Sequence, residues 1–161
     1  GDSLGWAVLH TDDIRRGVAA SAGEEVGAAA PGEGIYDDAH RDAVYDELIR
    51  QARILLSGGE SVVLDASWTG AHHRRLGTDL AEETYAELVE IEGRLDPSVA
   101  KERIARRREE ATTNSDATAE TVDHLGALRD PWVSATGVDT GGTKATVLDH
   151  ACGVVLSDER P

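Results

Sequence analysis

The sequence predicts an α/β fold, namely a three-layer sandwich in which helices cover both faces of a mostly parallel sheet. Short apolar runs alternate along the chain with segments of helical periodicity, as they do where helices connect parallel strands. One of these runs, Ser61–Ala66 (SVVLDA), is apolar until a terminal acid, which is typical of a buried parallel strand. The length of 161 residues suits one domain with its own core, so residues 1–161 are expected to form a single domain.

The N-terminal part is expected to form a strand, a helix, a loop and a long helix. Trp6–Thr11 (WAVLHT) is a short run of strand formers, and Asp12 or Asp13 after it has the character of a helix N-cap. Residues 22–35 are small, glycine-rich and interrupted by a proline, which predicts a loop. Residues 38–56 carry apolar side chains at helical spacing, and a pair of glycines ends the pattern.

The rest of the chain continues the alternation. An arginine-rich helix is expected to open at a proline, which is favoured in the first turn of a helix. The elements expected after the SVVLDA strand are a helix over Ala71–Thr84, a strand over Ala86–Ile91, a helix from Pro97 to Ala111, a helix over Ala119–Leu128, a strand over Ser134–Asp139 and a helix within residues 143–156. No internal repeat interrupts this order.

The composition argues against several classes of protein. Acidic residues outnumber basic ones by 31 to 16, giving a formal net charge of −15, so nonspecific binding to nucleic acid is not expected. No stretch approaches the roughly 18 to 20 apolar residues of a membrane span, and no signal peptide opens the chain. Cys152 is the single cysteine, which fits a reducing, cytoplasmic location. The chain contains no methionine, which indicates a processed product or a piece of a longer reading frame.

Polar residues follow three of the expected strands, and ligands bind at the carboxyl ends of strands in open parallel sheets. Asp12 and Arg15 are three residues apart, so they share a face on the first turn of a helix. The acid can accept the proton of an attacking hydroxyl and the arginine can hold an anion; an N-cap with a surface arginine is the alternative. Asp65 ends the SVVLDA strand, where an acid can hold Mg²⁺ or orient an acceptor. Asp139 and Thr140 follow the last strand.

An arginine cluster is unusual in a chain this acidic. Arg103, Arg106 and Arg107 lie at i, i+3 and i+4 and would share one face of the helix that begins at Pro97. Grouped guanidinium groups suit phosphate oxygens and the charge that develops during phosphoryl transfer. A solvent-exposed face held by salt bridges to nearby glutamates explains the same pattern equally well.

Five segments in order resemble one family. They are T-D-x-x-R at Thr11–Arg15, D-A-S-W at Asp65–Trp68, the arginine-rich helix after Asp96-Pro97, S-D-A-T at Ser115–Thr118 and V-D-T-G at Val138–Gly141. Together they resemble the P-loop kinase-like ATPases of the zeta toxin, chloramphenicol phosphotransferase and polynucleotide kinase group. The likeness is closest to the ATP-binding domain that is often fused to an aminoglycoside-phosphotransferase-like domain. It spans about residues 4–156 and implies a P-loop nucleoside-triphosphate-hydrolase-like fold that uses ATP and Mg²⁺.

The resemblance implies roles on the acceptor side of the site. Asp12 would be the base that receives the proton of the acceptor hydroxyl, and Arg15 would position the acceptor. Asp65 would bind Mg²⁺ or the acceptor. Residues 22–35 and the helix after them would line the acceptor pocket, and Tyr36 would contact the substrate there.

The resemblance also implies roles on the nucleotide side. A lid within residues 97–118 would close over the transferred phosphate. Its arginines would be Arg103 and Arg107, with Arg106 as a substitute, next to the segment that begins with Ser115 and Asp116. Asp139 and Thr140 would lie near the adenine.

The phosphate-binding loop of this family, G-x-x-x-x-G-K-[ST], is absent where the order of segments requires it. It should end roughly 20 residues before Thr11, and only ten residues precede Thr11. The amides and lysine of that loop hold the phosphates, and its Ser/Thr holds Mg²⁺. The expectation is therefore a domain that lacks its first strand and phosphate loop and is inactive by itself. It would also be marginally stable or oligomeric, because the missing central strand exposes sheet edges.

Gly137–Lys144 (GVDTGGTK) narrowly misses the same pattern, because the lysine comes one residue late and Ala145 replaces Ser/Thr. The segment also resembles the first phosphate motif of sugar kinases with an actin-like fold, of which the chain would then be a fragment. A last strand and a turn into the C-terminal helix is the simplest interpretation.

The histidines predict no metal site. His72 and His73 are adjacent and do not share a helix face, and no acid stands at metal-ligand spacing from them. The other histidines are scattered along the chain, so neither a zinc nor an iron site is expected.

Two hypotheses about function remain open. The first is an ATP-dependent phosphotransferase domain that moves the γ-phosphoryl group of Mg-ATP to a hydroxyl of a small molecule. The second is a noncatalytic remnant that binds a nucleotide or a partner without turnover. Oligomerisation or a fused domain is compatible with either.

Overall fold

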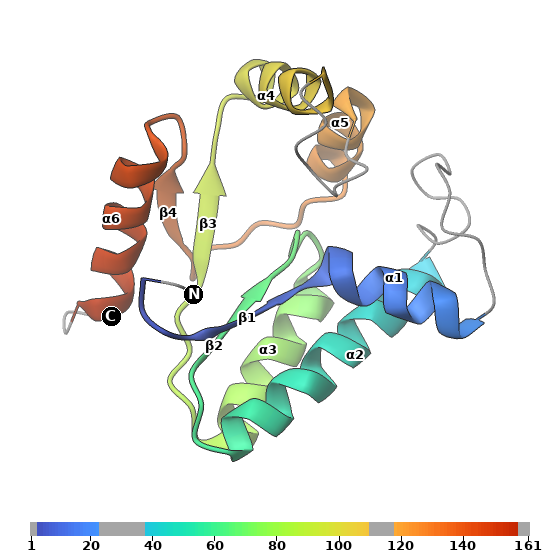
Figure 1. Ribbon diagram of the computed structural model, residues 1–161, viewed down its shortest axis with the longest axis vertical. Coiled ribbons are helices and arrows are strands. Elements are labelled where there is room, and N and C mark those ends of the chain that lie inside the picture. The colour runs from blue at the N-terminus through green and yellow to red at the C-terminus, as the bar shows by residue number, and fades with distance from the viewer. Residues whose placement is uncertain (1–2, 23–37, 110–117, 158–161) are drawn as a thin grey trace.

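The computed structural model describes residues 3–22, 38–109 and 118–157, in which strands and helices alternate (Figure 1). The strands are β1 (Ala7–His10), β2 (Val62–Asp65), β3 (Ile91–Arg94) and β4 (Thr136–Asp139). The helices are α1 (Thr11–Ala22), α2 (Asp38–Ser57), α3 (Ala71–Thr84), α4 (Pro97–Glu109), α5 (Ala119–Ala127) and α6 (Lys144–Leu156). The predicted α/β class is confirmed.

The four described strands pair two by two, and each pair is parallel. β1 pairs with β2, which places His10 opposite Asp65, and β3 pairs with β4, which places Arg94 opposite Asp139. Both pairs run toward the upper part of Figure 1. Since the last residues of paired parallel strands lie side by side, the polar strand ends noted in the sequence meet in two places.

The core lies between α2 and the β1–β2 pair. Val44, Tyr45 and Leu48 are buried on one face of α2, together with Ile14 of α1. A second cluster continues along α2 and reaches α3; it contains Ile49, Ala52 and Leu80. Apolar side chains of both strands, among them Leu9 and Leu64, pack against these clusters. The helix α2 is therefore the element around which this part of the molecule packs.

We expect Leu48→Ala to lower the free energy of unfolding by about 3 kcal/mol, because it removes a fully buried side chain and leaves a cavity. Leu48 is 0% exposed. Urea denaturation followed by circular dichroism measures the effect. Ile54→Ala is the control, since Ile54 lies on the same helix and is 60% exposed. Equal losses in the two variants would contradict the position of the core.

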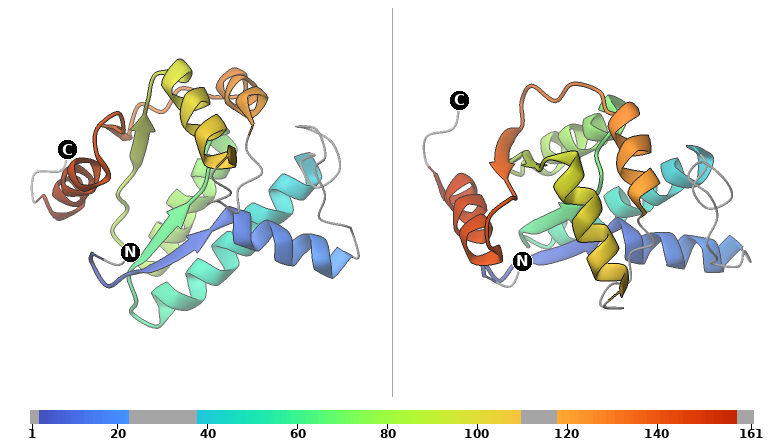
Figure 2. Two further views of the ribbon diagram at one scale, coloured as in Figure 1. Left: turned by 45° about the horizontal axis from the view of Figure 1, so that its top comes forward. Right: turned by 90° about the horizontal axis from the view of Figure 1, so that it is seen from above.

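The β3–β4 pair carries the remaining helices. α6 packs against β4, and α4 and α5 lie together beyond the carboxyl end of β3 (Figures 1 and 2). Val138 of β4 is buried, whereas α6 has no fully buried residue and leaves Leu148 and Leu156 exposed. No helix in the described part of the chain has both the length and the apolar character needed to cross a membrane.

The GVDTGGTK segment adopts the simplest of the predicted structures. It forms β4, a turn and the start of α6, whose N-cap Thr143 accepts a hydrogen bond from the amide of Thr146 at 3.2 Å. The hairpin that an actin-like phosphate motif needs is not formed here, so that alternative is wrong.

One predicted strand is misplaced. Ala86–Ile91 was expected to be extended and paired, but β3 begins only at Ile91. The reason is the end of α3, where Tyr85 takes a left-handed conformation with φ 55° and the amide of Ala86 donates to the carbonyl of Ala81 at 2.9 Å. Residues 86–90 therefore connect the end of α3 to β3, and the chain pairs with β4 only from Ile91 onward.

Candidate functional site

The first group of candidate residues lies where β1 and β2 end. α1 begins at Thr11 with no loop after β1, so Asp12 and Asp13 occupy its first turn and neither is the N-cap, contrary to the prediction. Acids in a first turn are favoured by the helix dipole. The buried Thr11 donates its hydroxyl to the carbonyl of Asp65 at 3.3 Å, which fixes the start of α1 to the end of β2.

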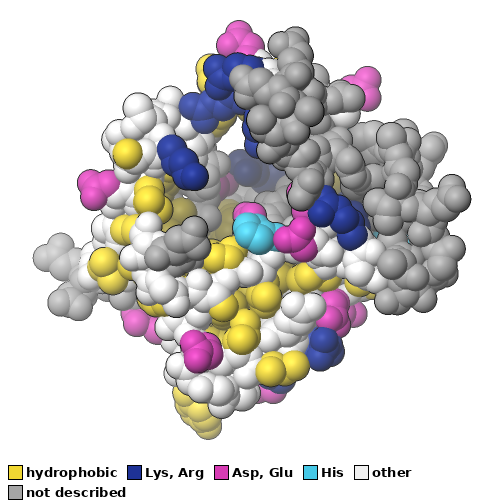
Figure 3. All heavy atoms as spheres, viewed as in Figure 1, with side chains coloured by type: hydrophobic (Ala, Val, Ile, Leu, Met, Phe, Trp, Pro, Cys, Tyr) yellow, Lys and Arg dark blue, Asp and Glu magenta, His cyan; other side chains and the backbone are white. Residues whose placement is uncertain are grey.

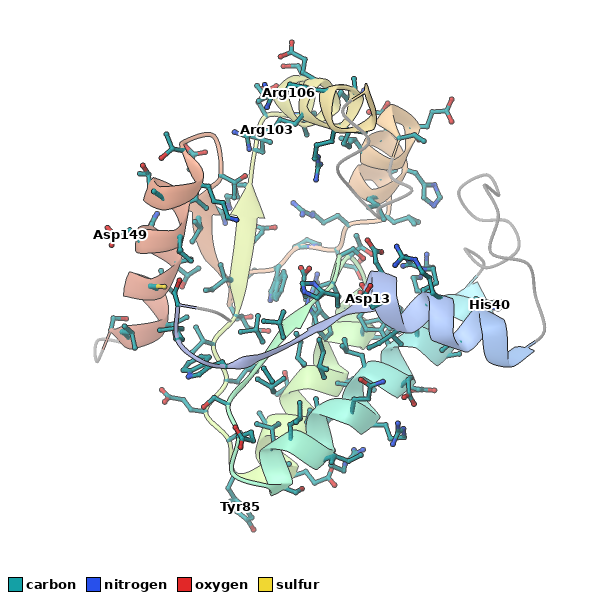
Figure 4. The ribbon with its side chains drawn as sticks, in the orientation of Figure 1. Asp13, His40, Tyr85, Arg103, Arg106 and Asp149 are labelled. Atoms are coloured by element: carbon teal, nitrogen blue, oxygen red, sulfur yellow. The ribbon has the colours of Figure 1, made fainter. Side chains whose placement is uncertain are left out.

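Asp12 and Arg15 form the pair that their spacing predicts. The Nη1 of Arg15 donates to Oδ1 of Asp12 at 2.6 Å. Asp13 and Arg16 repeat the arrangement one residue later at 3.3 Å, with both side chains more exposed. Asp13 lies at the start of α1 in Figure 4. The Asp12–Arg15 pair is thus the more sheltered of two ion pairs that are otherwise alike.

Asp65 has a partner that the sequence did not indicate. Nδ1 of His10 lies 2.8 Å from Oδ2 of Asp65, and both side chains are exposed. The contact follows from the register, in which the last residues of β1 and β2 are opposite one another. An ionised carboxylate offers about four acceptor positions, so this hydrogen bond leaves Asp65 able to bind a cation or its water.

The second group lies where β3 and β4 end. The amide and hydroxyl of Thr140 both donate to the carbonyl of Arg94, at 2.8 and 3.1 Å. Oδ1 of Asp139 accepts from the amide of Gly141 at 2.7 Å. Asp139 and Thr140 therefore shape the turn between β4 and α6.

The three candidate arginines of α4, Arg103, Arg106 and Arg107, are in different environments. Arg103 is half-buried and donates to the carbonyls of Thr140 and Gly141 at 2.7 and 3.1 Å, which holds α4 against the turn after β4. Arg106 and Arg107 are exposed. Figure 4 shows Arg103 close to the end of β3 and Arg106 farther along α4. Arg103 thus has a structural contact of its own, and the role of all three toward phosphate stays a prediction.

The segment after Asp65 is tightly held. Trp68 has a φ of 48°, which is unusual for a residue other than glycine and costs free energy that its neighbours must offset. Its amide donates to the hydroxyl of Tyr45 at 3.0 Å, and its indole nitrogen donates to the carbonyl of Leu64 at 3.3 Å. The D-A-S-W segment is therefore a fixed turn that anchors the end of β2 to α2.

Several predicted residues fall outside the described part of the chain. They are Tyr36, residues 23–35 of the acceptor loop, and Ser115 and Asp116 of the lid segment. The described part of the proposed lid is α4 together with Thr118.

The site combines acids with nearby basic groups. Figure 3 shows a histidine and acidic side chains in the hollowed middle of one face, and basic side chains gather above and beside them. Carboxylates repel a phosphate group, so a phosphate that binds near them needs a cation between itself and the carboxylates. The arrangement suits a phosphate ester that carries a divalent metal ion.

The chain is similar to several known proteins. A family model described as an AAA domain matches residues 2–131. Uncharacterized proteins of Mycobacterium tuberculosis (Rv2004c) and Mycobacterium bovis (Mb2027c) are each 36% identical over 151 residues, which is 92% of this chain and 29% of theirs. The chain thus spans less than a third of the length of these curated relatives.

A solved structure shares the fold. The crystal structure of a gluconokinase from Sinorhizobium meliloti 1021 superposes with a TM-score of 0.63, covering 96% of this chain and 79% of that one at 17% identity. With the family match, this likeness confirms the predicted P-loop kinase-like fold.

Proposed function

This chain belongs to the AAA domain family and has a kinase-like P-loop fold. On that premise we propose that, within the protein at its natural length, it takes part in the transfer of the γ-phosphoryl group of ATP to a hydroxyl of a small molecule. One observation carries the proposal. Asp65 ends β2, and Asp12 lies in the first turn of α1 directly after the neighbouring end of β1, where it is paired with Arg15 at 2.6 Å. Carboxylates at this edge of a parallel sheet are where phosphoryl transfer needs them.

In the proposed reaction, the acceptor oxygen attacks the γ-phosphorus as its proton passes to a carboxylate oxygen of Asp12. The new O–P bond forms while the bond from the γ-phosphorus to the β,γ-bridging oxygen breaks, and ADP leaves with that electron pair. Arg15 holds Asp12 in place and offers a positive charge to the anionic groups. Asp65 would supply an oxygen ligand to Mg²⁺, and the charge of that ion would lower the repulsion between nucleophile and phosphate.

The second group of residues supports the nucleotide side of the proposal. Arg103 ties α4 to the turn at Asp139 and Thr140, so a movement of α4 would be passed to that turn. Arg106 and Arg107 are exposed on the same helix, where their guanidinium groups can reach phosphate oxygens.

The test is phosphoryl transfer by the protein at its natural length. We expect label to pass from γ-labelled ATP to one member of a panel of sugars, aminoglycosides and nucleosides, and to require Mg²⁺. In Asp65→Asn, the Mg²⁺ concentration for half-maximal rate should rise by about tenfold or more, since a ligand is lost. Transfer that continues in excess EDTA, or an unchanged Mg²⁺ requirement in Asp65→Asn, would contradict the proposal. Nucleotide binding without transfer to any acceptor would favour the noncatalytic alternative.

We expect residues 1–161, expressed by themselves, to turn over no ATP. These residues contain no G-x-x-x-x-G-K-[ST] sequence, whose backbone amides and lysine would hold the phosphate groups. Release of ADP is the measurement, with the protein of natural length as the positive control. ATP turnover that survives repeated purification and disappears in Asp12→Ala would show that the expectation is wrong.

A further inference from the structure

Three potential metal ligands meet between α2 and α3, and the proposed reaction uses none of them. Nε2 of His73 lies 2.8 Å from Oδ1 of Asp42, and Nε2 of His72 lies 3.6 Å from the same oxygen. One ligand atom from each residue lies within 4.8 Å of the others. His72 and His73 stand in the first turn of α3, and Asp42 stands in the N-terminal part of α2.

The ring of His73 is held in place by packing. It is 2% exposed, and its plane stacks on Tyr45 with centroids 3.8 Å apart and 15° between the planes. Its Nδ1 has no hydrogen-bond partner among the described residues. Its Nε2 is the ring nitrogen that faces Asp42 and would be the metal ligand.

The other two ligands are accessible and oriented. Asp42 and His72 are exposed, and the rings of His72 and His73 lie 3.8 Å apart. Gly70 makes room for this arrangement, since a Cβ there would lie 2.8 Å from the His72 ring. One fixed imidazole is thus joined by an imidazole and a carboxylate that solvent ions can reach.

We propose that Asp42, His72 and His73 form a binding site for one Zn²⁺ ion. In a tetrahedral zinc site with bonds of about 2.0–2.1 Å, neighbouring ligand atoms are about 3.3 Å apart. The two imidazole nitrogens lie 2.8 and 3.6 Å from the oxygen of Asp42, on either side of that value, so small side-chain movements suffice. Three protein ligands leave a fourth position for water, as in zinc sites that are open to solvent.

The chemistry of the ligands selects the metal. Imidazole nitrogens suit Zn²⁺ and its transition-metal neighbours, whereas Mg²⁺ prefers oxygen ligands. The site is therefore separate from the Mg²⁺ ligand proposed at Asp65, and it would tie α2 to α3 whether or not the chain is a kinase.

The test is zinc binding by the protein at its natural length, in buffer with excess Mg²⁺. We expect isothermal titration calorimetry with Zn²⁺ to distinguish His72→Ala and Asp42→Asn from the wild type. Each variant should either bind one Zn²⁺ ion fewer per protein or bind that ion at least about tenfold more weakly. Co²⁺ at the site should give visible absorption bands of a four-coordinate ion, and both variants should lose them. Because His72 and Asp42 are exposed, the variants should keep the circular dichroism spectrum of the wild type.

A matched variant separates this site from accidental histidine binding. His150→Ala removes an exposed histidine of α6 and should leave the stoichiometry, the affinity and the Co²⁺ spectrum unchanged. The proposal is overturned if the wild type binds no Zn²⁺, if the two ligand variants bind as the wild type does, or if Mg²⁺ competes for the same equivalent. None of these outcomes depends on phosphoryl transfer, so failure here would leave the proposed function untouched.

Discussion

The Arg74→Ala variant is expected to lose about 4 kcal/mol of its free energy of unfolding. Arg74 is 8% exposed, and its guanidinium group donates to main-chain carbonyl oxygens rather than to an acid. The two shortest of these bonds reach Trp68 at 2.8 Å and Pro131 at 2.9 Å. Hydrogen bonds to charged groups contribute about 1.5–3 kcal/mol each, so the loss of two gives an effect of this size.

The position of these carbonyls explains the importance of the side chain. One set belongs to the strained turn at Trp68 and Thr69, and the other belongs to Asp130 and Pro131. Those two segments are some 60 residues apart in sequence, and Arg74 joins them. The ring of Trp132 lies 5.0 Å from the guanidinium carbon and covers it from one side.

Chemical denaturation monitored by tryptophan fluorescence and by circular dichroism measures the loss. Arg75→Ala is the control, because it removes the same charge from an exposed neighbour and should change stability by less than about 0.5 kcal/mol. Arg74→Lys should recover only part of the lost stability, since the single nitrogen of an ammonium group cannot donate to both sets of carbonyls as the separate nitrogens of a guanidinium group can. If Arg74→Ala were as stable as Arg75→Ala, the bridge between the two segments would contribute nothing.

Several helix ends were predictable because a proline or a pair of glycines marks them, as Gly58 and Gly59 do after α2. The bounds of α3 were predicted to the residue, and α4 begins at Pro97 as expected. The strands were less well defined, because a strand of four residues carries little pattern of its own and depends on its partner. The error at β3 shows this, since the cap at Tyr85 decided where the chain could begin to pair.

The candidate site was predictable only in its local parts. The Asp12–Arg15 pair lies within one helical turn, and its spacing suffices to predict the contact. The His10–Asp65 pair depends on which strands are neighbours and in what register, and neither is visible in the sequence of one strand. For the same reason the sequence placed Arg103 beside phosphate but did not reveal its bonds to the turn after β4.

The cluster at Asp42 shows the limit of reasoning from spacing. The sequence predicts no metal site at the adjacent histidines of α3, because no acid stands at metal-ligand spacing from them. The packing of α2 against α3 brings Asp42 to them from 30 residues upstream. Contacts between helices depend on how apolar faces pack, and that is a property of the whole fold.

Replacing Asp12 by asparagine is expected to lower kcat for phosphoryl transfer by about 10²- to 10⁴-fold, with little change in KM. An amide has nearly the shape of a carboxylate and can still accept the hydrogen bond from Arg15, so the first turn of α1 should keep its structure. What the variant loses is the ability to take a proton from the acceptor hydroxyl. Steady-state kinetics on the protein of natural length measure the effect, with the acceptor found by the labelling assay.

Asp13→Asn is the matched control for this result. It removes the same charge from the same helical turn, and its partner Arg16 stands at the same spacing as Arg15 does from Asp12. Because Asp13 is more exposed and its ion pair is on the surface, kcat should stay within about twofold of the wild type. A fall of equal size in both variants would mean that charge near the site matters and the position of Asp12 does not. If kcat in Asp12→Asn were instead close to that of the wild type, the base would have to be another group, and the exposed His10–Asp65 pair at the neighbouring strand ends would be the next to test.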